Sequence, residues 1–153
     1  METSSAAVTK GVRGGNRSAR ASVVWLAAAI DVVAVFVFVA TGRSSHAEAL
    51  SVAGLAQTAW PFLGGALVGW LIAGLLTRGA WHSPLEVVRT GLVVWVSTVI
   101  IGMLLRVVSG QGTALAFIIV AIVVLGMLLV GWRALAILIR HLRGRRPAQQ
   151  AAG

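Results

Sequence analysis

Asp31 is an acidic side chain about halfway along the first of four long apolar runs. A charged aspartate at that depth in a bilayer costs roughly 2.5–3.5 kcal/mol on insertion scales, so such residues are functional candidates by default. Alanines at positions i−4, i−3 and i+3 would let another helix approach closely. We therefore expect Asp31 to face the interior of a helix bundle. It is either a proton or cation site, or a neutral carboxyl group hydrogen-bonded to Ser97, Thr98 or a tryptophan N–H.

Arg106 is the second intramembrane polar candidate, two residues before the third apolar run closes. Gly91 and Gly102 share its helical face, which indicates a packed face. Three interpretations stay open: a side chain that snorkels to the interface, an ion pair with Glu48, or an anion site in a pore. Arg106 is roughly 12 Å from Asp31 along the membrane normal at a rise of about 1.5 Å per residue, so no direct pair is expected. No other charge is expected as deep as Asp31.

Arg43, His46 and Glu48 form a polar cluster that we place at the outer surface, between the first two runs. A histidine beside a glutamate can bind a metal or relay protons. Two candidate ligands make an incomplete metal site, however, so an interfacial turn with a solvated salt bridge is the favoured interpretation. We expect no metal and no cofactor.

Small residues recur every fourth position in the second run, at Gly65, Gly69 and Ala73. This ladder is typical of transmembrane helices that pack closely. The pattern alone does not distinguish packing within one chain from dimerisation.

These residues are carried by four apolar stretches, each of a length that spans a bilayer as a helix. The expected spans cover about residues 22–41, 54–76, 84–108 and 113–139. The sequence thus predicts an all-α, four-transmembrane-helix bundle over residues 20–142, between disordered basic tails at 1–19 and 143–153. The first span holds an aspartate and exceeds the usual apolar length of a signal peptide, so we expect it to be retained.

Basic residues set the expected orientation. They gather in both tails and in the second loop, whereas the first and third connections carry few. The positive-inside rule therefore predicts that both termini are cytoplasmic, in a plasma membrane whose anionic lipids attract the tails. Trp132 is assigned to the cytoplasmic border of the fourth span and Arg133 to a position just inside it.

The composition excludes several classes of protein. Hydrophobic residues make up 58% and charged residues 11% of the 153 positions, too few charges to cover a soluble domain. The net charge of +9 is concentrated at the ends of apolar spans, which argues against nucleic-acid binding. With no cysteine and one intramembrane acid that lacks an expected partner, we predict that the protein is not an enzyme.

Six segments distributed over the four spans form a recognisable pattern: Asp31, 42–46, 60–62, 89–91, 102–106 and 110–113. The pattern resembles an uncharacterised family of small four-span membrane proteins, frequent in actinobacteria and classed as a domain of unknown function. The resemblance covers about residues 20–140 and is most specific at 42–46 and 102–106. It implies an architecture and a membrane location, but no activity or cofactor.

Two classes of function are compatible with these features. The first is a small, oligomeric permease or proton- or ion-translocating protein that uses Asp31, with Arg43, His46 and Arg106 at the outer mouth. The alternative is an accessory or scaffold subunit that contacts another membrane protein through the ladder of the second span.

Overall fold

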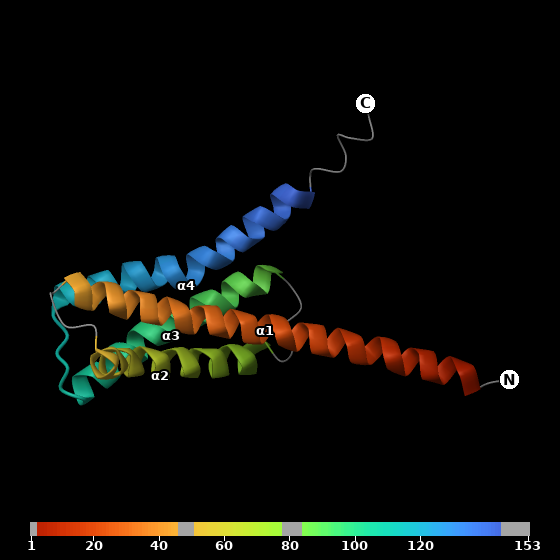
Figure 1. The fold of residues 1–153 in the computed structure, drawn as a ribbon, viewed down its shortest axis with the longest axis horizontal. Coiled ribbons are helices and arrows are strands. Elements are labelled where there is room, and N and C mark those ends of the chain that lie inside the picture. The colour runs from red at the N-terminus through yellow and green to blue at the C-terminus, as the bar shows by residue number, and fades with distance from the viewer. Residues whose placement is uncertain (1–2, 46–50, 78–83, 145–153) are drawn as a thin grey trace, which may run out of the picture.

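Four helices make up the part of the chain that the structure, a computed structural model, describes: residues 3–45, 51–77 and 84–144. They are α1 (Thr3–Ser45), α2 (Val52–Thr77), α3 (Pro84–Val108) and α4 (Leu115–Gly144) (Figure 1). Each contains a stretch long and apolar enough to cross a membrane. The prediction of an all-helical, four-span bundle is thereby confirmed.

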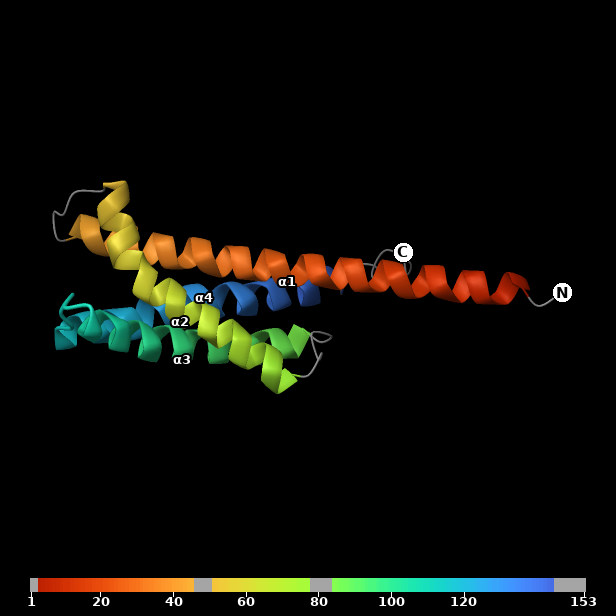
Figure 2. The same ribbon diagram turned by 90° about the horizontal axis from the view of Figure 1, so that it is seen from below.

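Local signals account for where the helices begin and bend. Pro84 opens α3, as expected of a residue whose missing N–H is not needed in a first helical turn. Ser51 caps α2, since its hydroxyl accepts a hydrogen bond from the backbone N–H of Gly54 (3.1 Å). Pro61 lies inside α2, and the helix changes direction in this region (Figure 2), because proline removes one backbone hydrogen bond.

The helical tails differ from the prediction. We expected disorder up to residue 19, whereas α1 begins at Thr3 and continues without a break into the apolar span. Once a helix is nucleated, each further residue adds a hydrogen bond, and no proline interrupts this stretch. At the other terminus, α4 extends to Gly144, just past the start expected for the tail.

The helices are arranged in sequential order around the bundle. Each packs against its neighbours along the chain, and α4 closes the ring against α1. Ser45, Val52, Val108 and Leu115 lie at one end of the bundle, here the Ser45 end; Thr77 and Pro84 lie at the other, here the Thr77 end (Figure 1). The order could not be predicted from the sequence.

Aromatic rings fill the core toward the Ser45 end. The rings of Phe38 and Phe62 meet edge to face, with centroids 5.2 Å apart. Phe117 lies 6.1 and 6.2 Å from these two rings. Gly102 makes room for the cluster, because a Cβ there would lie 2.8 Å from the ring of Phe62. The three phenylalanines therefore join α1, α2 and α4 across the middle of the bundle.

Candidate functional site

A buried ion pair lies deep in the apolar spans, between α1 and α4. The guanidinium of Arg133 donates two hydrogen bonds to the carboxylate of Asp31, from Nη1 to Oδ1 and from Nη2 to Oδ2, each 2.7 Å long. Both side chains are only 1% exposed. This bidentate geometry is the strongest form of an arginine–carboxylate pair. It confirms that Asp31 faces the bundle interior.

Two tryptophans complete the surroundings of the carboxylate. Trp70 of α2 donates its indole N–H to Oδ2, and Trp132 of α4 donates to Oδ1, both at 3.1 Å. The guanidinium carbon of Arg133 also lies 4.6 Å from the Trp132 ring centroid and 5.9 Å from that of Trp70. Indoles thus stabilise the anion through their N–H groups and the cation through their faces. Three helices contribute to this Asp31–Arg133 centre.

Space for Arg133 is provided by a glycine on α3. A Cβ on Gly91 would lie 2.6 Å from Cδ of Arg133. Arg133 also donates from Nη1 to the carbonyl of Leu129 on its own helix. Its Nε, although buried, has no hydrogen-bond partner among the described residues. Gly91 and Leu129 thus complete the enclosure of the guanidinium.

Arg133 is the functional candidate that sequence reasoning missed. It was placed just inside the cytoplasmic border of the fourth span, and Asp31 was expected to lack a charged partner; the second expectation is wrong, because Arg133 pairs with Asp31 in the bundle interior. Asp31 lies nine residues into the first span and Arg133 six residues before the expected end of the fourth, a difference of about 4.5 Å in depth. An arginine side chain is long enough to span that difference. Comparing the depths of Asp31 and Arg133 from the same membrane face could therefore have predicted the pair.

The hydrogen-bonding alternative for Asp31 is correct in one part. The tryptophan N–H contact was expected, and two such contacts are present. Thr98, by contrast, donates to the carbonyl of Val94 on its own helix (2.7 Å). Hydroxyl groups in transmembrane helices commonly bond to the preceding turn in this way.

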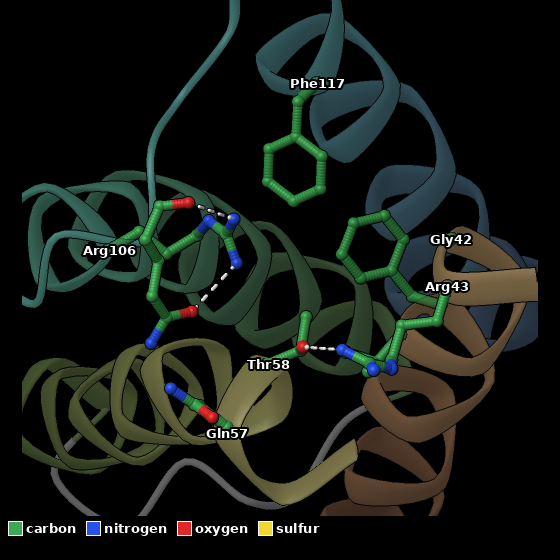
Figure 3. A pocket seen from close by; sticks show the side chains of 9 residues that line it. Gly42, Arg43, Gln57, Thr58, Arg106 and Phe117 are labelled. Atoms are coloured by element: carbon green, nitrogen blue, oxygen red, sulfur yellow. Dashed lines mark hydrogen bonds between the residues drawn. The ribbon is translucent and has the colours of Figure 1, made fainter. Parts of the chain in front are cut away.

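A second polar site, here the arginine pocket, lies on the bundle axis at the Ser45 end. Figure 3 shows Arg43 entering from α1 and Arg106 from α3 on the opposite side, with Thr58 between them and Phe117 nearby. The cavity has a volume of about 280 Å³, and all four helices contribute to its lining. The lining residues are Phe38, Val39, Gly42, Arg43, Gln57, Thr58, Arg106, Gln111 and Phe117.

Both arginines of the pocket donate hydrogen bonds to described residues that fix their positions. Arg43 Nη1 donates to Oγ1 of Thr58 (3.0 Å), which itself donates to the carbonyl of Gly54 (3.0 Å). Arg106 donates to the side-chain and main-chain oxygens of Gln111 at 3.0 and 3.1 Å, and to the carbonyl of Gly112 at 3.2 Å. These contacts orient the guanidinium groups in advance of any ligand.

Gly110 and Gly112 allow the turn that meets Arg106. Their φ angles are +71° and +70°, in the left-handed region that glycine adopts without steric penalty. The chain therefore turns tightly over residues 109–112. Its main-chain oxygens face Arg106, which explains why this arginine points into the pocket and is not a purely snorkelling side chain.

The remaining residues of the expected outer cluster are not described. His46 and Glu48 lie outside the described residues, so the expected pair of Arg106 with Glu48 stays a prediction. Among the residues that the structure describes, no group of three histidine, cysteine, aspartate or glutamate side chains is placed to hold a metal ion.

A family model for a protein of unknown function, DUF3054, matches residues 28–136. The chain belongs to this family. The match confirms the resemblance to a family of unknown function and covers most of the expected 20–140. No curated protein and no solved structure matches the chain.

The DUF3054 region contains both polar sites, since it extends from before Asp31 to after Arg133. It also contains the small-residue ladder, which faces α3 of the same chain. A Cβ on Gly65 would lie 2.9 Å from Cα of Thr98, and one on Gly69 would lie 2.8 Å from Cα of Val94. Ala73 is buried too. The two glycines are thus occupied by packing within the chain, so the contact expected for an accessory subunit is already filled.

Proposed function

We propose that the protein is a small permease or ion-translocating protein of the plasma membrane. The observation that carries this proposal is the buried Asp31–Arg133 centre. A buried ion pair stabilises a fold poorly compared with apolar packing, whereas charged residues deep in a membrane commonly mark ion or proton pathways. The arginine pocket at the Ser45 end supports the same interpretation.

In this proposal, Asp31 acts through its pairing with Arg133. Protonation of the carboxylate would remove its charge and leave the buried guanidinium without a counter-ion. Arg133 would then attract an anion that enters the bundle. Deprotonation would restore the pair and release the anion, so movement of the anion would be coupled to movement of a proton.

Loss of the pair is expected to abolish pH-dependent flux. We would reconstitute the protein in liposomes that contain a pH-sensitive dye and impose a pH gradient. Asp31→Asn and the double variant Asp31→Leu/Arg133→Met should show background flux, while Arg89→Gln, an exposed arginine on α3, should match the unchanged protein. Full flux from a correctly inserted double variant would rule out the proposed role of Asp31.

Both termini are proposed to be cytoplasmic, with anionic lipid headgroups near the basic tails. The chain has no cysteine, so single introduced cysteines report topology without background. We expect a membrane-impermeant maleimide to label Ser109→Cys on intact cells and Arg140→Cys only after permeabilisation; both positions are exposed and they occupy opposite ends of the bundle. The reverse labelling pattern would invert the orientation.

We further propose that the working form is a homo-oligomer without a catalytic activity. Four helices from one chain barely enclose a pathway. Native mass spectrometry of the tagged protein, extracted in mild detergent, should show a single oligomer of this chain. A stoichiometric second protein would instead favour an accessory role.

A further inference from the structure

The arginine pocket joins a charged side and an apolar side in one small cavity. Arg43 and Arg106 approach from opposite helices, and Gln57 contributes an amide to the same lining (Figure 3). Phe38, Val39 and Phe117 form the other side. A ligand that satisfies both sides must be amphiphilic, with an anionic group and a short apolar group.

The charge balance at this end of the bundle favours an anion. The acids of the sequence are Glu2, Asp31, Glu48 and Glu86. Asp31 is committed to Arg133, and Glu86 belongs to the first turn of α3, at the Thr77 end. Glu48 is the one acid in the sequence between α1 and α2, the two helices that this segment connects at the Ser45 end. Even with Glu48 beside the pocket, two guanidinium groups leave an excess of positive charge.

The two arginines are donors of the kind that binds carboxylates. Arg106 already donates one hydrogen bond from Nη1 and two from Nη2 within the chain, so a carboxylate would receive the second N–H of Nη1 and not a paired fork of Nη1 and Nη2. Arg106 is also stacked against Phe117, with its guanidinium carbon 4.4 Å from the ring centroid, so charged and apolar contacts lie side by side. The guanidinium of Arg43 packs against Gly54 of α2, where an added Cβ would lie 2.5 Å from Nη2 of Arg43. Both guanidinium groups are therefore preorganised for binding.

The size of the cavity limits the ligand. Its volume of about 280 Å³ is at the lower edge of the roughly 300–1,000 Å³ typical of pockets for drug-sized ligands. We propose that the arginine pocket binds a small monocarboxylate, with the carboxylate between Arg43 and Arg106 and the short apolar group against Phe38 and Phe117. This inference deepens the proposed function and rests on it for the role of the site as the entry point of the transported anion.

Calorimetric titration of the full-length protein in an uncharged detergent tests the site without requiring transport. Benzoate and butyrate are the probes, and benzyl alcohol and benzylamine are the neutral and cationic controls. We expect saturable binding of the carboxylates and at least about tenfold weaker binding of both controls, because each loses the charge-assisted hydrogen bonds. Equal binding of the controls, or no saturable binding of either carboxylate, would overturn the proposal.

Matched variants locate the binding. Arg43→Gln and Arg106→Gln should each weaken benzoate binding at least about tenfold, whereas Arg89→Gln, on the same helix as Arg106, should stay within about twofold. Should Arg106→Gln fail to fold, Arg43→Gln and Arg106→Lys carry the test, because lysine keeps the charge but loses the planar fork. Unchanged affinity in the folded arginine variants would overturn the assignment.

Two further experiments are needed. The first distinguishes a carboxylate ligand from a phosphate headgroup, and the second distinguishes failure of the proposed binding site from failure of the proposed permease function. Tighter binding of inorganic phosphate, or displacement of benzoate by phosphatidylglycerol in nanodiscs at equal concentration, would replace the carboxylate assignment by a phosphate site. Uptake of labelled benzoate into proteoliposomes is measured separately. Binding without uptake would overturn the permease and keep the site, whereas uptake that Arg43→Gln leaves intact would overturn the site and keep the permease.

Discussion

Arg133→Met is expected to lower the free energy of unfolding by about 3–5 kcal/mol, because it leaves the buried carboxylate of Asp31 without its cation. Asp31→Leu should have a similar effect, since it isolates the buried guanidinium. The double variant Asp31→Leu/Arg133→Met removes both charges and should recover most of this loss. Well-packed apolar replacements of buried ion pairs are often neutral or stabilising.

A double-mutant cycle in mixed micelles measures the coupling, with equilibrium unfolding followed by circular dichroism. Arg140→Met is the matched control, because Arg140 is exposed on the same helix. It should change the free energy of unfolding by no more than about 0.5 kcal/mol. A double variant whose loss equals the sum of the two single losses would show that the two charges do not stabilise one another.

Gly69→Leu is expected to destabilise the bundle by about 3 kcal/mol, at the upper end of the usual effect of overpacking. Any side chain at this position would clash with the backbone of α3, because the nearest atom to an added Cβ is Cα of Val94, at 2.8 Å. Backbone atoms yield less readily than the end of a flexible side chain. Thermal unfolding in detergent would measure the effect.

Gly131→Leu on α4 is the matched control, since an added Cβ there meets no atom within 4 Å. This variant should be neutral or slightly stabilising, because leucine favours a helix more than glycine does. Native mass spectrometry of Gly69→Leu separates the two uses of the ladder. A well-folded variant that has lost an oligomer or a partner protein would show that the ladder acts between chains and not against α3 of the same chain.

The architecture followed from the sequence because membrane insertion is a local requirement. Each span must be apolar over about 20 residues and must form its backbone hydrogen bonds within its own helix. Each span can therefore be predicted from its own residues alone. The start of α3 at Pro84 was predicted from the sequence for the same reason. Asp31 was identified as an interior residue because an acid in a lipid-facing position is too costly.

The partners of these residues depended on how the helices pack. Arg133 is 102 positions from Asp31, and Trp70 comes from a third helix, so nothing local marks them as one centre. The small-residue ladder announced a close contact, but only the order of the helices around the bundle assigned it to α3. The arginine pocket likewise exists because α1 and α3 both end beside α2 at the Ser45 end. The spacing of residues along a helix determines which of its faces carries polar or small side chains. The tertiary structure decides which neighbouring helix packs against that face, because this depends on how all four helices pack together.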